Sequence, residues 1–347
     1  MDISSIAIKS YFSSVYGLLY PYLGSSVANE ALSLLIGIAV FCIILAIMIS
    51  LFGIMYGWAE RKVIARMQSR HGPTYLGKFG LLQNVADLIK LLSKENILPD
   101  KADRRIFPFV LPAVFASFAL MLAFTPFTPS FVGIDTSVAV ILVFALLSIS
   151  PILMFLAGWT SGNKYGSISA QRSVAIMISY EIPLMLAVVA AAMSAHSLNF
   201  MSIVSSQTHL WNIVAMPIGF VVFFVVLLAE LERPPFDLKE ADSELISGWL
   251  TDVSPPYYAL ALLLDYARML FGVLVISVIF LGGWLGPAPL PPYAWMAIKV
   301  VLLSAIIIAF RGTFFRMRLD RLIRAGWNYL MPLSILNLLI TFLLFVR

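Results

Sequence analysis

The chain has 347 residues, of which 61% are hydrophobic and only 12% are charged, and its mean hydropathy is +0.95. A soluble domain carries about twice that charged fraction. The composition therefore excludes a soluble protein and predicts a single integral membrane domain over residues 1–347. The net charge of +5 does not indicate a nucleic-acid partner, because most basic residues lie in loops beside apolar segments.

Eight apolar segments are long enough to cross about 30 Å of hydrocarbon as helices. In chain order they are 31–57, 106–125, 137–159, 173–195, 212–231, 257–283, 293–311 and 328–346. The predicted fold class is therefore an all-α polytopic membrane protein with about eight transmembrane helices. Residues 2–28 are amphipathic, and we expect them to lie on the membrane surface.

The basic residues orient this predicted bundle. Nineteen of the 23 lysines and arginines fall in the loops 58–105, 159–172, 232–256 and 311–327. Cytoplasmic loops carry such an excess of basic residues, so we expect these loops in the cytoplasm and both termini on the non-cytoplasmic side. The expected location is a prokaryotic cytoplasmic membrane, in preference to the inner membrane of an organelle.

Residue types that hold metals are scarce. Cys42 is the single cysteine, and one thiol can form neither an iron–sulfur cluster nor an internal disulfide. The histidines His71, His196 and His209 have no ligand-like partner three or four residues away. We expect no metal site and no redox centre in this chain, so electrons for any redox chemistry must arrive on another subunit.

The first long loop, residues 58–105, contains a helix of a different kind. Its segment 81–95 has apolar side chains on one face and charged side chains elsewhere. The apolar stripe comprises Leu81, Leu82, Val85, Leu88, Ile89 and Leu92. This pattern predicts an amphipathic helix in the plane of the membrane interface. It is either an ordinary surface helix or one beside which an apolar molecule enters from the bilayer.

Two predicted spans contain a carboxylate. Glu181 lies in ISYEIPLML, and Asp265 lies in LLLDYARML. An ionisable side chain at membrane depth indicates a functional site, and Pro183 loosens the backbone beside Glu181 so that water can reach it. For Asp265 the alternative is a local ion pair with Arg268, three residues later on the same helix.

The loop 232–256 and the helix end before it are acidic. The segment AELERPPFDLKEADSELISGW, residues 229–249, holds six of the chain's 18 acids. Pro234 and Pro235 must end the fifth span, and Asp237 with Glu240 has the spacing of a helix N-cap and its capping-box partner. Capping does not explain the other four acids. Like charges crowded beside a membrane boundary suit proton uptake or charge coupling.

The last loop, residues 311–327, carries five arginines against one aspartate. Such a loop is either an anchor of the membrane topology or a docking surface for an acidic soluble partner. It is expected on the same side as the acidic segment, where soluble partners dock.

Four segments together resemble one family of membrane subunits. They are ERKVIARMQSRHGP with GLLQNVADLIKLLSKE, GWTSGNKYGSISAQRSVAIMISYEIPL, AELERPPFDLKEADSELISGW and FRMRLDRLIRAGWNYLMPLS. They are similar to the cytoplasmic loops of the H subunit of proton-pumping NADH–quinone oxidoreductase (respiratory complex I), which is called NADH dehydrogenase subunit 1 in mitochondria. The similarity follows the family's order from about residue 58 to residue 335.

The resemblance implies a subunit that joins the peripheral arm of the complex to its membrane arm and forms much of the quinone chamber. Quinone or methanophenazine is then the substrate, whereas FMN and iron–sulfur clusters belong to partner subunits. The implied partners are the soluble iron–sulfur and quinone-site subunits, the small and antiporter-like membrane subunits, and membrane lipid. The implied electron donor is NAD(P)H, a deazaflavin or ferredoxin.

The resemblance also implies roles for residues of this sequence. A chain of carboxylates would couple quinone reduction to proton translocation. Its members would be Glu181, Glu230, Glu232, Glu240, Asp242, Glu244 and Asp265. The residues near the mouth of the quinone chamber would be Glu60, Arg61, Arg66, Arg233, Phe236 and Asp237.

Two other functions fit parts of the sequence. The first is the membrane anchor of a related membrane-bound hydrogenase, which reduces no quinone. The second is a free-standing ion transporter, although no inverted repeat is visible and the predicted cytoplasmic loops are long and charged. Purification separates the classes, because a transporter is stable alone whereas a subunit is isolated with its partners.

Overall fold

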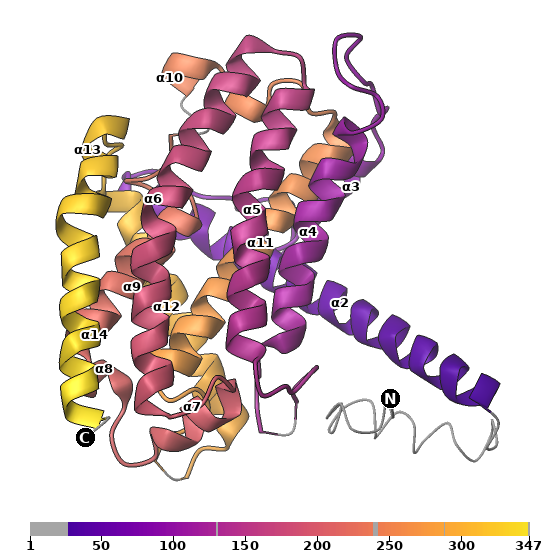
Figure 1. Ribbon diagram of the computed structural model, residues 1–347. Coiled ribbons are helices and arrows are strands. Elements are labelled where there is room, and N and C mark those ends of the chain that lie inside the picture. Colours follow the sequence, from indigo (N-terminus) through magenta and orange to yellow (C-terminus); the bar gives the residue numbers. More distant parts are fainter. Residues whose placement is uncertain (1–26, 130, 239–241, 288, 346–347) are drawn as a thin grey trace.

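The computed structural model describes residues 27–129, 131–238, 242–287 and 289–345, with side chains outside the description at 27–35, 242 and 243. Within these ranges the chain is helical, and its one extended pairing is an isolated bridge between Thr128 and Phe131. The all-α polytopic fold is thereby confirmed (Figure 1). The amphipathic segment predicted at 2–28 lies, apart from its last two residues, outside the described part.

Seven helices of the described chain are long and apolar enough to cross a membrane. They begin with α2 (Val27–Met67), α4 (Phe107–Phe124), α5 (Ala139–Thr160) and α6 (Lys164–Ser194). The others are α11 (Pro255–Phe280), α12 (Pro292–Thr313) and the continuous run Leu319–Phe345, which comprises α13 (Leu319–Ala325), a π-helical turn (Gly326–Leu330) and α14 (Met331–Phe345).

The fifth predicted span, 212–231, differs from the expectation. It is divided into α8 (Asn212–Ala215) and α9 (Pro217–Glu230), with Met216 in a non-helical conformation between them. The residue before a proline avoids the helical region, and Pro217 has no N–H to continue the helix. The 14 residues of α9 rise only about 21 Å, so this element is shorter than a full span.

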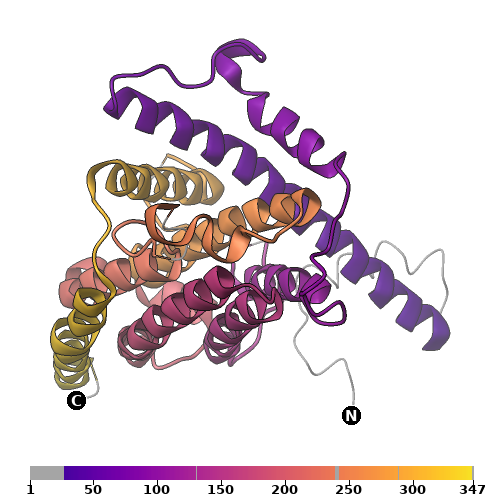
Figure 2. The ribbon, with the colours of Figure 1, turned by 90° about the horizontal axis from the view of Figure 1, so that it is seen from above.

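The first predicted span also differs, because α2 continues ten residues past its predicted end at residue 57 and reaches Met67. The added residues, WAERKVIARM, contain neither glycine nor proline, and most of them are good helix formers. The N-terminal end of α2 extends away from the other helices (Figures 1 and 2), whereas Phe41 and Leu45 further along it are buried in the core. Cys42 is exposed on the first half of this helix. The second half carries Glu60 into the bundle.

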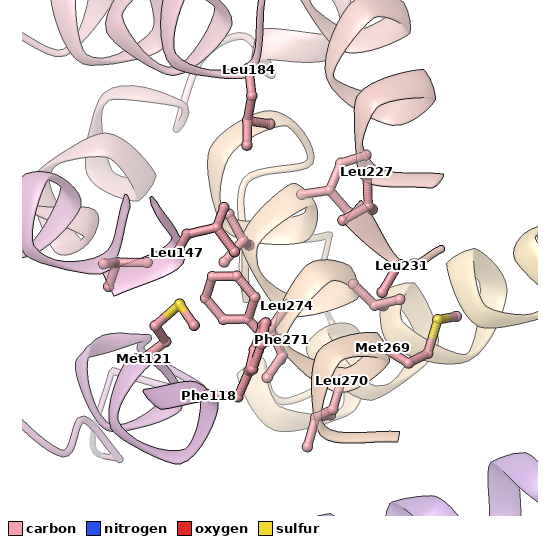
Figure 3. Packing of buried hydrophobic residues seen from close by; sticks show 14 of the residues in the cluster. Phe118, Met121, Leu147, Leu184, Leu227, Leu231, Met269, Leu270, Phe271 and Leu274 are labelled. Atoms are coloured by element: carbon pink, nitrogen blue, oxygen red, sulfur yellow. The ribbon is translucent and has the colours of Figure 1, made fainter. Parts of the chain in front are cut away.

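Helix α11 occupies the middle of the bundle, as the view from above shows (Figure 2). Every residue from 267 to 280 on this helix is buried, which is expected for a helix that is apolar on all sides. Around it pack side chains of α4, α5, α6 and α9 (Figure 3). Phe118 of α4, for example, meets Phe271 edge to face with ring centres 6.0 Å apart.

Two glycines bring α2 close to α11. A Cβ atom on Gly53 would lie 2.8 Å from the ring of Tyr266, and one on Gly57 would lie 2.4 Å from the Tyr266 hydroxyl. Neither distance leaves room for a methyl group, so the close crossing of the two helices requires glycine at both positions. The crossing fixes the height at which Glu60, one turn further along α2, meets the rest of the protein.

The amphipathic helix is confirmed as α3 (Gln83–Leu92), which follows a short 3-10 turn (Lys78–Gly80). Asn84 donates to the Ile54 carbonyl at 3.0 Å, and Arg61 pairs with Asp87 at 2.7 Å. Partial burial opposes ionisation of Asp87, but hydrogen bonds from Arg61 and Gln83 lower its pKa below the ordinary carboxyl value. The helix is therefore held along α2, with Leu82, Ile89 and Leu92 exposed.

Candidate functional site

A cleft of about 730 Å³ opens where the second half of α2, the segment after α9, the first half of α11 and the end of α12 meet. Its walls combine aromatic and charged side chains. The charged ones are Glu60, Arg61, Arg70, Arg233, Asp237, Asp265, Arg311 and Arg316. Ligand sites typically combine an apolar or aromatic surface with a few convergent polar groups, so this cleft is the candidate site.

The cleft includes four of the six residues expected at the chamber mouth, namely Glu60, Arg61, Arg233 and Asp237. Arg66 is exposed in the last turn of α2 and does not line the cleft. Phe236 is buried beneath it and packs edge to face on Tyr180, with ring centres 5.1 Å apart. Its role in the structure is packing between the segment after α9 and α6.

Glu60 joins three parts of the cleft wall. Its Oε1 atom accepts from Arg311 Nη1 of α12 at 2.5 Å and lies 3.3 Å from Arg233 Nη1. The glutamate is only 6% exposed, whereas the Arg233 side chain is 11% and the Arg311 side chain 35% exposed, so one buried carboxylate compensates a largely buried and a partly exposed guanidinium group. Removing it would leave two cations facing each other in a low-dielectric site.

The chain leaves α9 through a tight turn at the start of the acidic segment. Leu231 ends the helix, Glu232 has a left-handed φ of 50°, and the Arg233 N–H returns to the Leu228 carbonyl at 3.2 Å. Glycine is the usual residue at this position of a helix end. A glutamate there costs about 1–2 kcal/mol of backbone strain, and the side-chain contacts of Glu232 offset that cost.

Those contacts form a buried ion pair. Arg268 Nη1 of α11 lies 2.5 Å from Glu232 Oε2, and Ser173 Oγ of α6 donates to Glu232 Oε1. The Arg268 side chain is 2% exposed. The local pair with Asp265, which the sequence left open as an alternative, is not the contact that the structure shows, because Arg268 pairs with an acid from a distant segment. Arg268 is a site residue that sequence reasoning missed, although an arginine within an apolar span is itself a functional signal.

The structure also places Asp265, Glu230 and Glu181, the other acids expected at or within the spans. Asp265 lines the cleft and also a space of about 10 Å³ that Glu232, Arg233 and Arg311 share. Glu230 is buried and, together with Arg268, lines a second space of about 20 Å³. Glu181 of α6 accepts a hydrogen bond from Ser148 of α5. Charged groups therefore continue from the cleft into the bundle.

The remaining acids are placed differently. Glu244 is exposed and pairs with Arg172 at 2.5 Å, outside the cleft lining. Asp242 begins the short helix α10 (Asp242–Leu245), and Glu240 lies outside the described residues. The expected N-cap is corrected as well, because Asp237 precedes α10 by five residues and its carboxylate pairs with Arg316 at 3.2 Å.

The basic loop contributes to the site. Arg311 and Arg316 line the cleft, and the Met317 N–H donates to the Pro235 carbonyl at 3.3 Å. The loop thus contacts the acidic segment directly. A loop that only anchored the membrane topology would not need this contact. Among the described residues, no group of three or more His, Cys, Asp or Glu side chains is arranged to hold a metal ion.

Known proteins resemble this chain over most of its length. A family model described as NADH dehydrogenase matches residues 38–342. The chain belongs to this family. The H subunit of NADH-quinone oxidoreductase from Bacillus cytotoxicus is 40% identical over 327 residues, which cover 93% of this chain and 97% of that protein. The H subunit from Bacillus thuringiensis is 41% identical over 313 residues, covering 89% and 93%.

A third relative comes from another bacterium. The H subunit of NADH-quinone oxidoreductase from Dehalococcoides mccartyi is 39% identical over 304 residues, covering 86% of each chain. The family match includes the cleft, the ion pair and each carboxylate of the predicted coupling chain. The resemblance inferred from four loop segments is therefore confirmed.

Proposed function

We propose that this chain is the membrane subunit of a redox-driven, proton-pumping quinone oxidoreductase. In this proposal the cleft is the mouth of the quinone chamber, and the acids behind it couple quinone reduction to proton translocation. The relatives are named as subunits of NADH-quinone oxidoreductase, which supports the class of reaction. The complex stands in a prokaryotic cytoplasmic membrane, with the cleft facing the cytoplasm.

One observation carries the coupling part of the proposal. One small space is lined by Asp265 and Glu232, and the other is lined by Glu230 and by Arg268, the partner of Glu232. A run of charged groups therefore leads from the cleft toward the membrane interior. Ionisable groups inside a membrane bundle are costly and mark proton or ion paths. A structural purpose alone does not require several acids so close together.

The cleft has the chemistry that such coupling needs. Reduction of a quinone to a quinol consumes two electrons and two protons, so negative charge develops at the head group until the protons arrive. Arg233 and Arg311 stand at the cleft with a shared carboxylate, Glu60. A change of charge there acts strongly on Asp265 and Glu232, because low-dielectric surroundings screen charges weakly.

Electrons reach the cleft from partner subunits in this proposal, since the chain supplies aromatic and charged side chains around the cleft and no cluster ligands among its described residues. The basic loop 311–327 and the extended end of α2 present the docking surface for the soluble iron–sulfur and quinone-site subunits. The exposed apolar half of α2 faces lipid or neighbouring membrane subunits.

Photoaffinity labelling of the intact complex tests the proposal. A quinone bearing a photoreactive group on its head is expected to attach to cleft residues such as Tyr258, Tyr266 or Trp249, and excess quinone is expected to prevent the attachment. Labelling confined to other parts of the chain would contradict the chamber assignment. Isolation of the chain with nickel-site subunits and without quinone-dependent activity would favour the hydrogenase anchor.

A further inference from the structure

A small cavity lies on the inner side of the buried ion pair, between α4, α5, α6, α9 and α11. Its volume is about 20 Å³. Most of its wall is apolar and includes Phe118, Leu147, Leu184, Leu227 and Phe271, whose side chains converge in Figure 3. Two charged side chains complete the wall, Glu230 from the end of α9 and Arg268 from α11.

Both charged side chains have polar atoms without a partner. Arg268 uses Nη1 for Glu232, and its guanidinium lies 5.1 Å from the centre of the Phe118 ring, whereas its Nε and Nη2 atoms have no hydrogen-bond partner in the described chain. Glu230 Oε2 is likewise without a hydrogen bond there. Arg268 is 2% exposed and Glu230 is 8% exposed. Buried polar groups are almost always satisfied, so three such atoms on one cavity indicate a molecule between them.

The chemistry of these atoms defines that molecule. The guanidinium offers only N–H donors, so its neighbour must accept. The carboxylate oxygen accepts when ionised, so its neighbour must also donate. Water does both, and a cavity of at least about 10–15 Å³ with two to four polar partners is what one buried water needs. The apolar remainder of the wall leaves no further polar group for a larger ligand.

We infer that this cavity is a binding site for one water molecule, which accepts from Arg268 and donates to Glu230, and that Arg268 is the positioning residue of the site. The water joins the Glu232–Arg268 pair to Glu230 and so closes the gap in the run of charged groups. The position of the water rests only on the cavity. Its part in proton coupling rests on the proposed function.

A high-resolution cryo-electron microscopy map of the intact complex tests the site directly. Density for one water is expected within hydrogen-bond distance of Arg268 and Glu230. A map that resolves other buried waters of the bundle and is empty at this position would overturn the inference. That result would leave the cleft and the carboxylates untouched, so it would not bear on the proposed function.

Two variants test the part of the water in coupling without removing a carboxylate. Arg268→Lys keeps the positive charge beside Glu232 but loses the Nε and Nη2 donors. Gly272→Ala adds a methyl group 2.4 Å from Leu227 Cδ1, and Leu227 is expected to turn into the cavity that it lines. Each variant should slow quinone reduction and proton pumping about tenfold, the factor that corresponds to one lost hydrogen bond to a charged group.

The control for Gly272→Ala is Gly219→Ala, which places a methyl group 2.8 Å from Asn337 Nδ2, between α9 and α14 and away from the cavity. Wild-type turnover is expected for this control in assembled complex. Turnover near wild type in both Arg268→Lys and Gly272→Ala would show that the water has no part in coupling. Water in the map together with wild-type rates in Glu230→Gln would instead contradict the proposed function.

Discussion

Arg268 and Glu232 are separated by 36 residues in the sequence, yet their side chains meet at 2.5 Å in the interior of the bundle. The pair connects the central helix α11 with the turn that leaves α9, and Ser173 adds a bond from α6. Three elements are thus joined through one carboxylate. A buried pair of this kind is weak evidence for stability by itself, but breaking it by removing one partner is costly.

Replacing Arg268 with methionine should therefore destabilise the protein strongly. Glu232 would remain buried without its counter-charge, at a cost of about 3–5 kcal/mol. The double variant Glu232→Gln/Arg268→Met removes both charges and should recover most of the assembled complex. Yield of complex and thermal unfolding in detergent measure the effect. Equal instability of the single and double variants would mean that the two charges do not compensate each other.

Removing the charge of Glu230 should lower coupled turnover while the complex still assembles. Glu230→Gln keeps size and hydrogen bonding but exchanges no proton, so quinone reduction and acidification of vesicles should fall severalfold together. Glu244→Gln is the comparison, because Glu244 is exposed and paired at the surface, where an ion pair contributes about 0–1 kcal/mol. A larger loss in Glu244→Gln than in Glu230→Gln would place the coupling path elsewhere.

The Glu60 carboxylate should matter most for use of quinone. In Glu60→Gln the side chains of Arg233 and Arg311 lose their shared counter-charge and repel each other across the cleft. We expect a raised KM for quinone and a severalfold lower kcat/KM in complex of normal subunit content. Arg66→Gln is the comparison on the same helix, because it also removes one charge, of the opposite sign, outside the cleft lining, and its kinetics should remain those of wild type.

Lys299 should be important for stability and unimportant for turnover. Its ammonium group donates to the carbonyls of Leu281, Gly283 and Leu285 at 2.6–2.8 Å and lies 4.4 Å from the ring of Trp211. Lys299→Met leaves these carbonyls without a donor and should cost about 2–3 kcal/mol, seen as a lower melting temperature. A specific loss of pumping at full assembly would reveal a role beyond this anchoring.

The predicted orientation can be checked with a single cysteine. Thr74 lies in the exposed connection between α2 and α3, and Cys42 must first be replaced by alanine. A membrane-impermeant thiol reagent should not label Thr74→Cys in intact cells but should label it in inverted vesicles. Efficient labelling from outside would reverse the topology and remove the docking surface from the cytoplasm.

Sequence alone could predict the features that depend on local pattern. Apolar length indicated the spans, the apolar stripe indicated α3, and isolated charge in apolar surroundings identified Glu181 and Asp265. It could not predict which partner Arg268 takes, because pairing across distant segments depends on how helices pack. The same limit applies to Asp237. Its spacing to Glu240 is that of an N-cap residue and its capping-box partner, but in the folded protein its carboxylate pairs with Arg316. The break at Pro217 follows from the proline, since the residue before a proline avoids the helical region, whereas hydropathy treats residues 212–231 as one span.

Helix α2 crosses α11 at Gly53 and Gly57, which lie directly against Tyr266. On one side of this crossing, Glu60 is about 5 Å away along the helix axis, whereas on the other side α2 continues for about 40 Å to Val27. Three side chains on this longer arm, Phe41, Leu45 and Ile49, are buried against the bundle, so the helix is held at more points than the two glycines. A displacement of the longer arm therefore meets these contacts before it reaches Glu60, the carboxylate that holds the cleft together.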